Sequence, residues 1–203
     1  MTTKLILVRH GRTAYNNLRR FTGQLDVPLD EAGEAQAERM AAYVLSHYAV
    51  DAICSSDLCR AQRTAKPVAD ALGLPIHPMG ELRERYVGWR QGKLFDEVKQ
   101  ESHLPHDDMG ESDEVFSARA LSAIEQIVSL HHGKTVLVVT HGGFIRFLRL
   151  ALEQIPHGQQ KEIGTVGNAT VSELEYQDGK GRFLSYGVGE HLGETPDSRA
   201  PAY

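Results

Sequence analysis

Residues 4–11 read KLILVRHG, a short aliphatic run that ends abruptly in arginine, histidine and glycine. A continuous apolar run of this length is typical of a strand buried on both faces, as in a parallel sheet. Residues 135–143, TVLVVTHGG, repeat the pattern, and this run also ends in histidine followed by glycine. Because ligands bind at the carboxyl ends of the strands in an open α/β sheet, we expect His10 and His141 to belong to one site.

Strand-like and helix-like segments alternate along the rest of the chain, which is the pattern of an α/β fold. Further strands are predicted at residues 52–55, 75–78, 170–176 and 183–186. Three predicted helices start with a residue type that caps helix N-termini, namely Asp30, Asp57 and Ser112, and a fourth helix follows His141. We therefore predict a three-layer α/β/α sandwich with a mostly parallel central sheet.

The 203 residues are interpreted as one domain, because no repeat or low-complexity linker divides them. Two segments depart from the alternation. Residues from about 88 to 110 are polar, rich in glycine, histidine and aspartate, and lack clear periodicity, so we expect an irregular cover over the site. Residues from about 194 to 203 are polar and hold two prolines, so we expect a loose tail.

The composition excludes several classes of protein. With 22 Lys and Arg against 27 Asp and Glu, the net charge is −5, which disfavours a partner such as nucleic acid or an anionic membrane. The longest aliphatic runs have four residues, far below the ~20 that span a bilayer, and we expect no signal peptide. The two cysteines, Cys54 and Cys59, form no CxxC pattern, so we expect a reducing, cytoplasmic location.

Positive side chains gather around the first strand-end histidine. Arg9 and Arg12 flank His10, and Arg60 lies in the first turn of the helix that follows the second predicted strand. Cations and helix N-terminal amides together bind phosphate oxygens without a metal. A lone histidine or arginine is more often a core or surface residue than a functional one. Two strand-end histidines with two arginines, however, indicate a phosphate site.

Five blocks of sequence, in order, resemble the histidine phosphatase superfamily, in the branch of cofactor-dependent phosphoglycerate mutases and related phosphatases. They are LVRHGRTAYN at 7–16, FTGQLDVPL at 21–29, SSDLCRA at 55–61, ELRE at 81–84 and, after GES at 110–112, VVTHGG at 138–143. The resemblance spans nearly the whole chain. It implies a metal-independent phosphomonoesterase, without a cofactor, that acts on small phosphorylated metabolites through a phosphohistidine intermediate.

The resemblance also implies roles for the matching residues. His10 would attack phosphorus, and His141 would join the arginines in neutralising the phosphoryl oxygens. Glu84 would protonate the leaving oxygen and then act as base on the hydrolytic water, whereas Glu81, three residues earlier, lies outside the matching position. The implied phosphate-binding residues are Arg9, Asn16, Thr22, Gly23, Arg60 and Gly142.

The main alternative is a cofactor-dependent phosphoglycerate mutase. Mutases of the family carry a longer insertion between the acid and the second histidine. The shorter segment in this chain favours hydrolysis. Arg12 stands where mutases usually carry glutamate, and its charge could favour multiply anionic substrates. A metal phosphohydrolase built on residues 106–108 lacks partner ligands at recognisable spacing. A non-catalytic binding protein is less favoured because His10 and Glu84 are both present. The sequence leaves open the leaving group of the substrate and the oligomeric state, a homodimer included.

Overall fold

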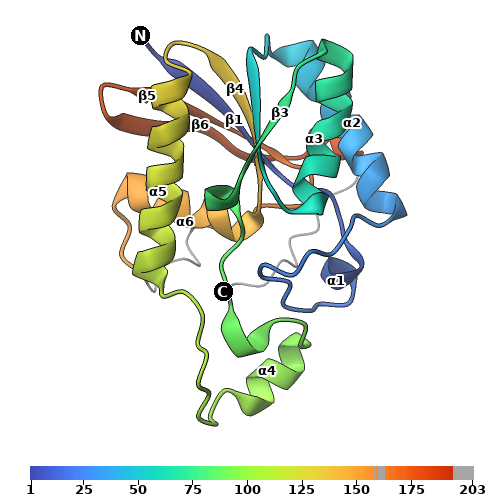
Figure 1. Ribbon diagram of the computed structural model, residues 1–203, viewed down its shortest axis with the longest axis vertical. Helices are drawn as coiled ribbons and strands as arrows, with labels where there is room; N and C mark the ends of the chain where they lie inside the picture. The colour runs from blue at the N-terminus through green and yellow to red at the C-terminus, as the bar shows by residue number, and fades with distance from the viewer. Residues whose placement is uncertain (158, 160–162, 194–203) are drawn as a thin grey trace.

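The computed structural model describes residues 1–157, 159 and 163–193 (Figure 1). In this part of the chain, six strands form one sheet in the order β3-β2-β4-β1-β5-β6. The strands are β1 Thr3–Arg9, β2 Ala52–Ser56, β3 Ile76–Met79, β4 Thr135–Thr140, β5 Val171–Gln177 and β6 Lys180–Val188. The first four strands run parallel to one another, and β5 is antiparallel to both of its neighbours. The sheet is therefore mostly parallel, as predicted.

Helices cover both faces of this sheet. The helices are α1 Ala14–Asn17, α2 Glu31–His47, α3 Cys59–Leu72, α4 Phe95–Glu101, α5 Asp113–Leu130 and α6 Gly142–Glu153, with 3-10 segments η1 Gly80–Leu82, η2 Gly88–Arg90 and η4 Glu190–Leu192. Helices α2 and α3 pack on one face, and α5 and α6 pack on the other (Figure 1). This arrangement is the predicted three-layer α/β/α sandwich. None of the described helices has the length and apolar character needed to span a membrane.

A hydrophobic core lies on each face of the sheet, and the central strands contribute to both cores. In β1, Leu5 and Leu7 join the core formed with α5 and α6, whereas Ile6 and Val8 join the core formed with α2 and α3. All four side chains are fully buried. Successive side chains of a strand point to opposite faces, so a strand covered on both sides must be apolar at every position.

The helix starts follow the sequence prediction in two of three cases. The side chains of Asp30 and Ser112 each accept a hydrogen bond from the backbone N–H three residues later. The prediction for Asp57 is wrong, because both of its carboxylate oxygens accept hydrogen bonds from Arg83. Asp26, from a distant loop, instead accepts the first free N–H of α3. The bidentate ion pair holds Asp57 away from the helix terminus.

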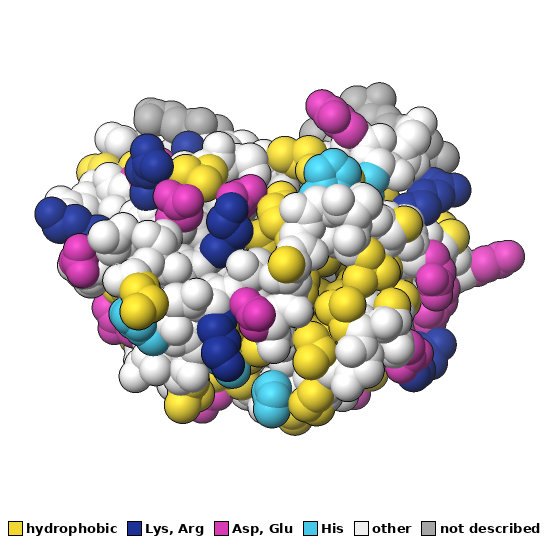
Figure 2. All heavy atoms as spheres, turned by 90° about the horizontal axis from the view of Figure 1, so that it is seen from above, with side chains coloured by type: hydrophobic (Ala, Val, Ile, Leu, Met, Phe, Trp, Pro, Cys, Tyr) yellow, Lys and Arg dark blue, Asp and Glu magenta, His cyan; other side chains and the backbone are white. Residues whose placement is uncertain are grey.

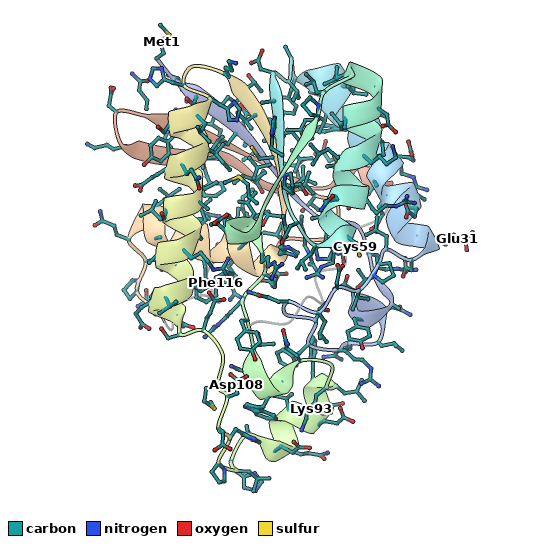
Figure 3. The ribbon with its side chains drawn as sticks, in the orientation of Figure 1. Met1, Glu31, Cys59, Lys93, Asp108 and Phe116 are labelled. Atoms are coloured by element: carbon teal, nitrogen blue, oxygen red, sulfur yellow. The ribbon has the colours of Figure 1, made fainter. Side chains whose placement is uncertain are left out.

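The cover segment differs from the irregular loop that was expected, because it contains the short helix α4. The centroid of the Phe95 ring of α4 lies 4.7 Å from that of Phe21, and Val98 of the same helix is buried. In Figure 3 the labelled side chains of Lys93 and Asp108 lie on this cover, beyond the end of the sheet. The helix is too short to display its own periodicity and depends on contacts with another segment. The predicted tail at 194–203 lies outside the described residues.

The end of the sheet opposite the cover carries charges of both signs. On this face, which Figure 2 shows from above, basic and acidic side chains are interspersed and form no large patch of one sign. Hydrophobic side chains gather on one part of it. Mixed charge of this kind is typical of a solvated surface.

Two glycines allow α2 to begin against the loop that follows β1. A Cβ atom on Gly33 would lie 2.0 Å from the carbonyl oxygen of Arg12, and one on Gly11 would lie 2.5 Å from the carbonyl oxygen of Gly33. Both contacts are with backbone, which cannot move aside as a flexible side chain can. This backbone contact places α2 directly beside the residue that follows His10.

The Gly33→Ala substitution should therefore destabilise the protein. An alanine in place of a helical glycine usually stabilises by about 0.5–1 kcal/mol, but overpacking here should lower the free energy of unfolding by about 1–3 kcal/mol. Urea denaturation measures the change. The control is Gly80→Ala, whose added Cβ meets nothing nearer than 3.9 Å. A more stable Gly33→Ala protein would contradict the expected clash.

Candidate active site

The carboxyl ends of β1 and β4 bring two histidines together, at the lower end of the sheet in Figure 1. The two strands pair in parallel with Arg9 opposite Thr140, and His10 and His141 are the next residues. Their ring centroids lie 5.1 Å apart, with an angle of 62° between the planes. Both side chains are buried, so the pair belongs to one enclosed site.

The backbone determines which nitrogen of His10 carries the proton. Its Nδ1 lies 2.7 Å from the carbonyl oxygen of Gly11, which can only accept, so Nδ1 is the donor and Nε2 holds the lone pair. The Gly11 N–H donates to Thr64 Oγ1, and the Gly11 carbonyl also accepts from Asn168 Nδ2 at 3.3 Å. The Asn168 amide donates to the carbonyl oxygen of His10 as well, at 3.0 Å. Thr64 and Asn168 thus hold the backbone around Gly11, whose carbonyl orients the ring.

Electrostatics favours the neutral form of both rings. Burial, followed by the positive charges of Arg60 and Arg9, holds the pKa of His10 well below 6.5. Burial, Arg60 and His10 lower the pKa of His141 in the same way. Both imidazoles are therefore neutral at pH 7, and His10 presents an unprotonated Nε2 that can act as a nucleophile.

His141 is equipped to donate a hydrogen bond. Its Nε2 lies 2.9 Å from Ser56 Oγ, and its Nδ1 is buried with no hydrogen-bond partner among the described residues. When the Ser56 hydroxyl donates to Nε2, the ring proton resides on Nδ1. A buried N–H without an acceptor is costly, and an anionic oxygen of a ligand would satisfy it.

Two buried arginines place positive charge beside the histidines. Arg60 is fully buried, and its Nη atoms donate to the carbonyl oxygens of Leu25 and Gly23 at 2.7 and 2.8 Å. Arg9 Nη1 donates to the carbonyl oxygen of Val166 at 2.6 Å. These bonds orient each guanidinium, which stays charged at every accessible pH. The arrangement is suited to a phosphate group.

A carboxylate lies at the N-terminus of α6. Glu84 is buried, and its oxygens accept hydrogen bonds from the backbone N–H of Gly143 at 3.0 Å and of Arg85 at 2.9 Å. A Cβ on Gly143 would lie 2.2 Å from Glu84 Oε1, so this glycine makes room for the carboxylate. Glu81 is exposed. The structure thus brings Glu84 to the site and leaves Glu81 in solvent.

The remaining sequence candidates lie around the same strand ends. Asn16 Oδ1 accepts from both the N–H and the hydroxyl of Thr13 and so caps α1, which leaves its amide nitrogen as the end that can donate to a ligand. Thr22 is buried, and the neighbouring Gly23 has the φ of +51° that glycine tolerates. Gly142 packs against Arg9, whose Cδ would lie 3.1 Å from an added Cβ.

Sequence reasoning missed several residues that shape the site. Ser56 and Thr64 stand in or beside a block that the resemblance identifies, but nothing in their spacing indicates a contact with His141 or Gly11. Asn168 lies in the loop before β5 and carries no sequence signal at all. Its role arises because β5 pairs with β1 and brings this loop beside His10.

The alternative metal site at residues 106–108 is not formed. The His106 ring stacks on Trp89 with centroids 3.5 Å apart, and Asp108 accepts hydrogen bonds from the Tyr86 hydroxyl and the Gly110 N–H. Among the described residues, no cluster of three or more histidine, cysteine, aspartate or glutamate side chains could hold a metal ion.

Known proteins resemble this chain in both sequence and fold. A model of the histidine phosphatase superfamily (branch 1) matches residues 5–189. The metal-independent phosphoserine phosphatase of Arabidopsis thaliana is 32% identical over 94% of this chain and 83% of its own length. A probable phosphoglycerate mutase, GpmB of Yersinia pestis, is 32% identical over 98% of this chain and 96% of its own. The structure of a mycobacterial glucosyl-3-phosphoglycerate phosphatase superposes with a TM-score of 0.81 at 29% identity, covering 93% of this chain and 100% of that one.

The lowered pKa values predict a pH dependence of stability. The unfolded chain has histidine pKa values near 6.5, so below this pH it binds more protons than the folded protein, and stability should fall as the pH drops from 6.5 toward 5. Replacing His10 by Asn should reduce this slope by up to about 1.4 kcal/mol per pH unit. Urea denaturation at several pH values measures it, with the exposed His132→Asn as control. An unchanged slope in the His10 variant would contradict a buried neutral ring.

Proposed function

Because this chain belongs to the histidine phosphatase superfamily, we propose that it hydrolyses small phosphate monoesters through a phosphohistidine formed on His10, without a metal ion. Phosphatase activity follows from the family and from the phosphatases among its relatives. The observation that carries the catalytic assignment is the state of His10. Its ring is buried and neutral, with Nδ1–H bound to the Gly11 carbonyl and Nε2 available beside two arginines.

In the first half of the reaction, His10 Nε2 attacks phosphorus and forms the P–N bond. The P–O bond to the leaving group breaks, and the carboxylic acid of Glu84 gives its proton to the leaving oxygen. Arg9 and Arg60 stabilise the charge on the phosphoryl oxygens, and the buried Nδ1–H of His141 donates to one of them. Asn16, Thr22, Gly23 and Gly142 complete the surroundings of the phosphate.

In the second half, water hydrolyses the phosphohistidine. The carboxylate of Glu84 takes a proton from the attacking water, the P–N bond breaks, and His10 returns to its neutral form with inorganic phosphate as the product. In both steps the Gly143 N–H, which binds Oε2 of Glu84, keeps this carboxyl group beside the site.

Metal-free hydrolysis is supported by where the positive charge comes from. In phosphatases that use a metal, the ion neutralises the phosphoryl oxygens. Here two guanidinium groups, each oriented by backbone carbonyls, supply that charge. The similar Arabidopsis thaliana enzyme is itself named as metal-independent.

Hydrolysis is favoured over mutase chemistry because cations that could hold a second anionic group are already engaged. Arg12 forms an ion pair with Asp30 at 2.9 Å, so its charge is partly neutralised. On the cover, Lys93 forms an ion pair with Glu101. A mutase must retain a bisphosphate with water excluded, which demands further positive charge. The substrate we propose therefore carries one phosphate on a small alcohol.

Two other assignments stay proposals. Residues 1–203 act as one unit, with the cover at 88–110 belonging to the same domain as the sheet. A cytoplasmic location is consistent with Cys54 and Cys59, which are both free thiols.

The acid role of Glu84 predicts a dependence on the leaving group. Glu84→Gln should lower kcat/KM for an alkyl phosphate such as phosphoserine by about 10²–10⁴-fold, and far less for p-nitrophenyl phosphate, whose leaving group needs little protonation. The parameter kcat/KM excludes hydrolysis of the intermediate, where Glu84 also acts. Glu81→Gln is the matched control and should behave as wild type, whereas His10→Ala should abolish turnover of both esters. Equal losses on the two esters would rule out Glu84 as the acid.

A single incubation separates phosphatase from mutase. With 3-phosphoglycerate and 2,3-bisphosphoglycerate present, free phosphate should form faster than 2-phosphoglycerate, as followed by NMR of phosphorus. Faster formation of 2-phosphoglycerate would establish mutase activity instead.

The proposal that no metal ion takes part is tested separately. The rate of hydrolysis of p-nitrophenyl phosphate should be unchanged by excess EDTA. Loss of activity in EDTA with recovery on adding one divalent ion would overturn the metal-free mechanism.

A further inference from the structure

The segment that carries Glu84 has no regular secondary structure of its own. Residues 83–87 lie between η1 and η2, outside any helix or strand. Its backbone groups therefore need partners from elsewhere, and its path is set by those partners. A loop is a less precise support for a reacting group than a strand end, such as the one that supports His10.

One side chain of α5 binds three carbonyl oxygens in and directly before this segment. Arg119 Nη1 donates to the carbonyl oxygens of Glu81 and Arg83, both at 2.8 Å, and Nη2 donates to that of Glu84 at 3.2 Å. The guanidinium also lies over the ring of Phe116, 4.8 Å from its centroid. Phe116 is fully buried on the inner side of α5 (Figure 3), so it gives the arginine a rigid base.

Glu111 holds both the arginine and the far end of the same segment. Its carboxylate accepts from Arg119 Nε at 2.8 Å and Nη2 at 2.7 Å, and one of its oxygens also accepts the Tyr86 N–H at 2.7 Å. The backbone N–H of Glu111 donates to the Tyr86 carbonyl. Although burial raises the pKa of Glu111, the hydrogen bonds from Arg119 and Tyr86 outweigh it and hold that pKa below its usual range.

The two side chains together bind backbone groups on both sides of the acid, at residues 81, 83, 84 and 86. Side chains of other segments bind fewer of the backbone groups at residues 81–86. Thr140 Oγ1 donates to the Leu82 carbonyl, and Gln24 Nε2 donates to that of Glu84. Neither Arg119 nor Glu111 is needed to bind phosphate or to move a proton in the mechanism above.

We propose that Arg119, paired with Glu111, is a positioning residue that holds residues 81–86, from the end of η1 into the loop, so that the Glu84 carboxylate stays on the N-terminus of α6. This proposal rests on the function of Glu84 given above. Its consequence is specific. Loosening the loop should impair proton transfer to the leaving oxygen and should leave the attack by His10 on an activated ester largely intact.

The test is Arg119→Lys, which keeps the charge but cannot reach three carbonyls and a carboxylate with one nitrogen. The kcat/KM for phosphoserine should fall at least about tenfold more than that for p-nitrophenyl phosphate. The control is Arg63→Lys, which disrupts two hydrogen bonds from the guanidinium to Glu34 Oε1, between α3 and α2. The second variant, for use if Arg119→Lys does not fold, is Glu111→Gln. It weakens the same ion pair and should show the same selective loss.

A double-mutant comparison separates positioning from general damage. In a Glu84→Gln background, Arg119→Lys should add no further difference between the two esters, because the group that it positions is gone. Equal losses on both esters, or losses that simply add, would overturn the positioning role. If Glu84→Gln itself shows no difference between the esters, the acid assignment fails and this proposal fails with it. If only Glu84→Gln shows the difference, the proposed function stands and the role of Arg119 is refuted.

Discussion

The parallel pairing of β1 with β4 is the constraint on which the rest of the site depends. Both strands are covered on two faces, so their central residues are all aliphatic, and polar residues are confined to the strand ends and the turns after them. The register aligns these ends, with Arg9 opposite Thr140. As a result, the strand register alone places His10 beside His141, and no contact between the two rings is required.

Burial and positive charge then give the two histidines their chemical state. Arg60 and Arg9 are oriented by backbone carbonyls, and both charges add to the effect of burial in lowering the pKa of His10. The same charges that make a protonated histidine unfavourable make a phosphate dianion favourable. One electrostatic arrangement therefore suits both the proposed nucleophile and the proposed phosphate site, and neither function has to be traded against the other.

Glu84 is supported in a different way. The proposed nucleophile, His10, follows a central strand, whereas the proposed acid lies on an irregular loop that is anchored by α5 and by the N-terminus of α6. The missing side chain at Gly143 provides the space for the carboxylate. The position of Glu84 thus depends on contacts between segments that are far apart in the sequence, and substitutions at some distance from the site can alter it.

The sequence alone was enough to predict the fold class, most strands and the residues expected at the strand ends, because continuous aliphatic runs and their abrupt polar ends are local features. It did not show helix α4 or the true partner of Asp57, since these depend on Phe21 and Arg83 from other segments. The folded structure was needed to show that Nδ1 of His10 carries the proton, that the charge of Arg12 is paired with Asp30, and that Asn168 reaches the backbone of the proposed nucleophile. Each of these depends on the distance between atoms that the folded chain brings together, and a pattern of residue types along the chain holds no such distances.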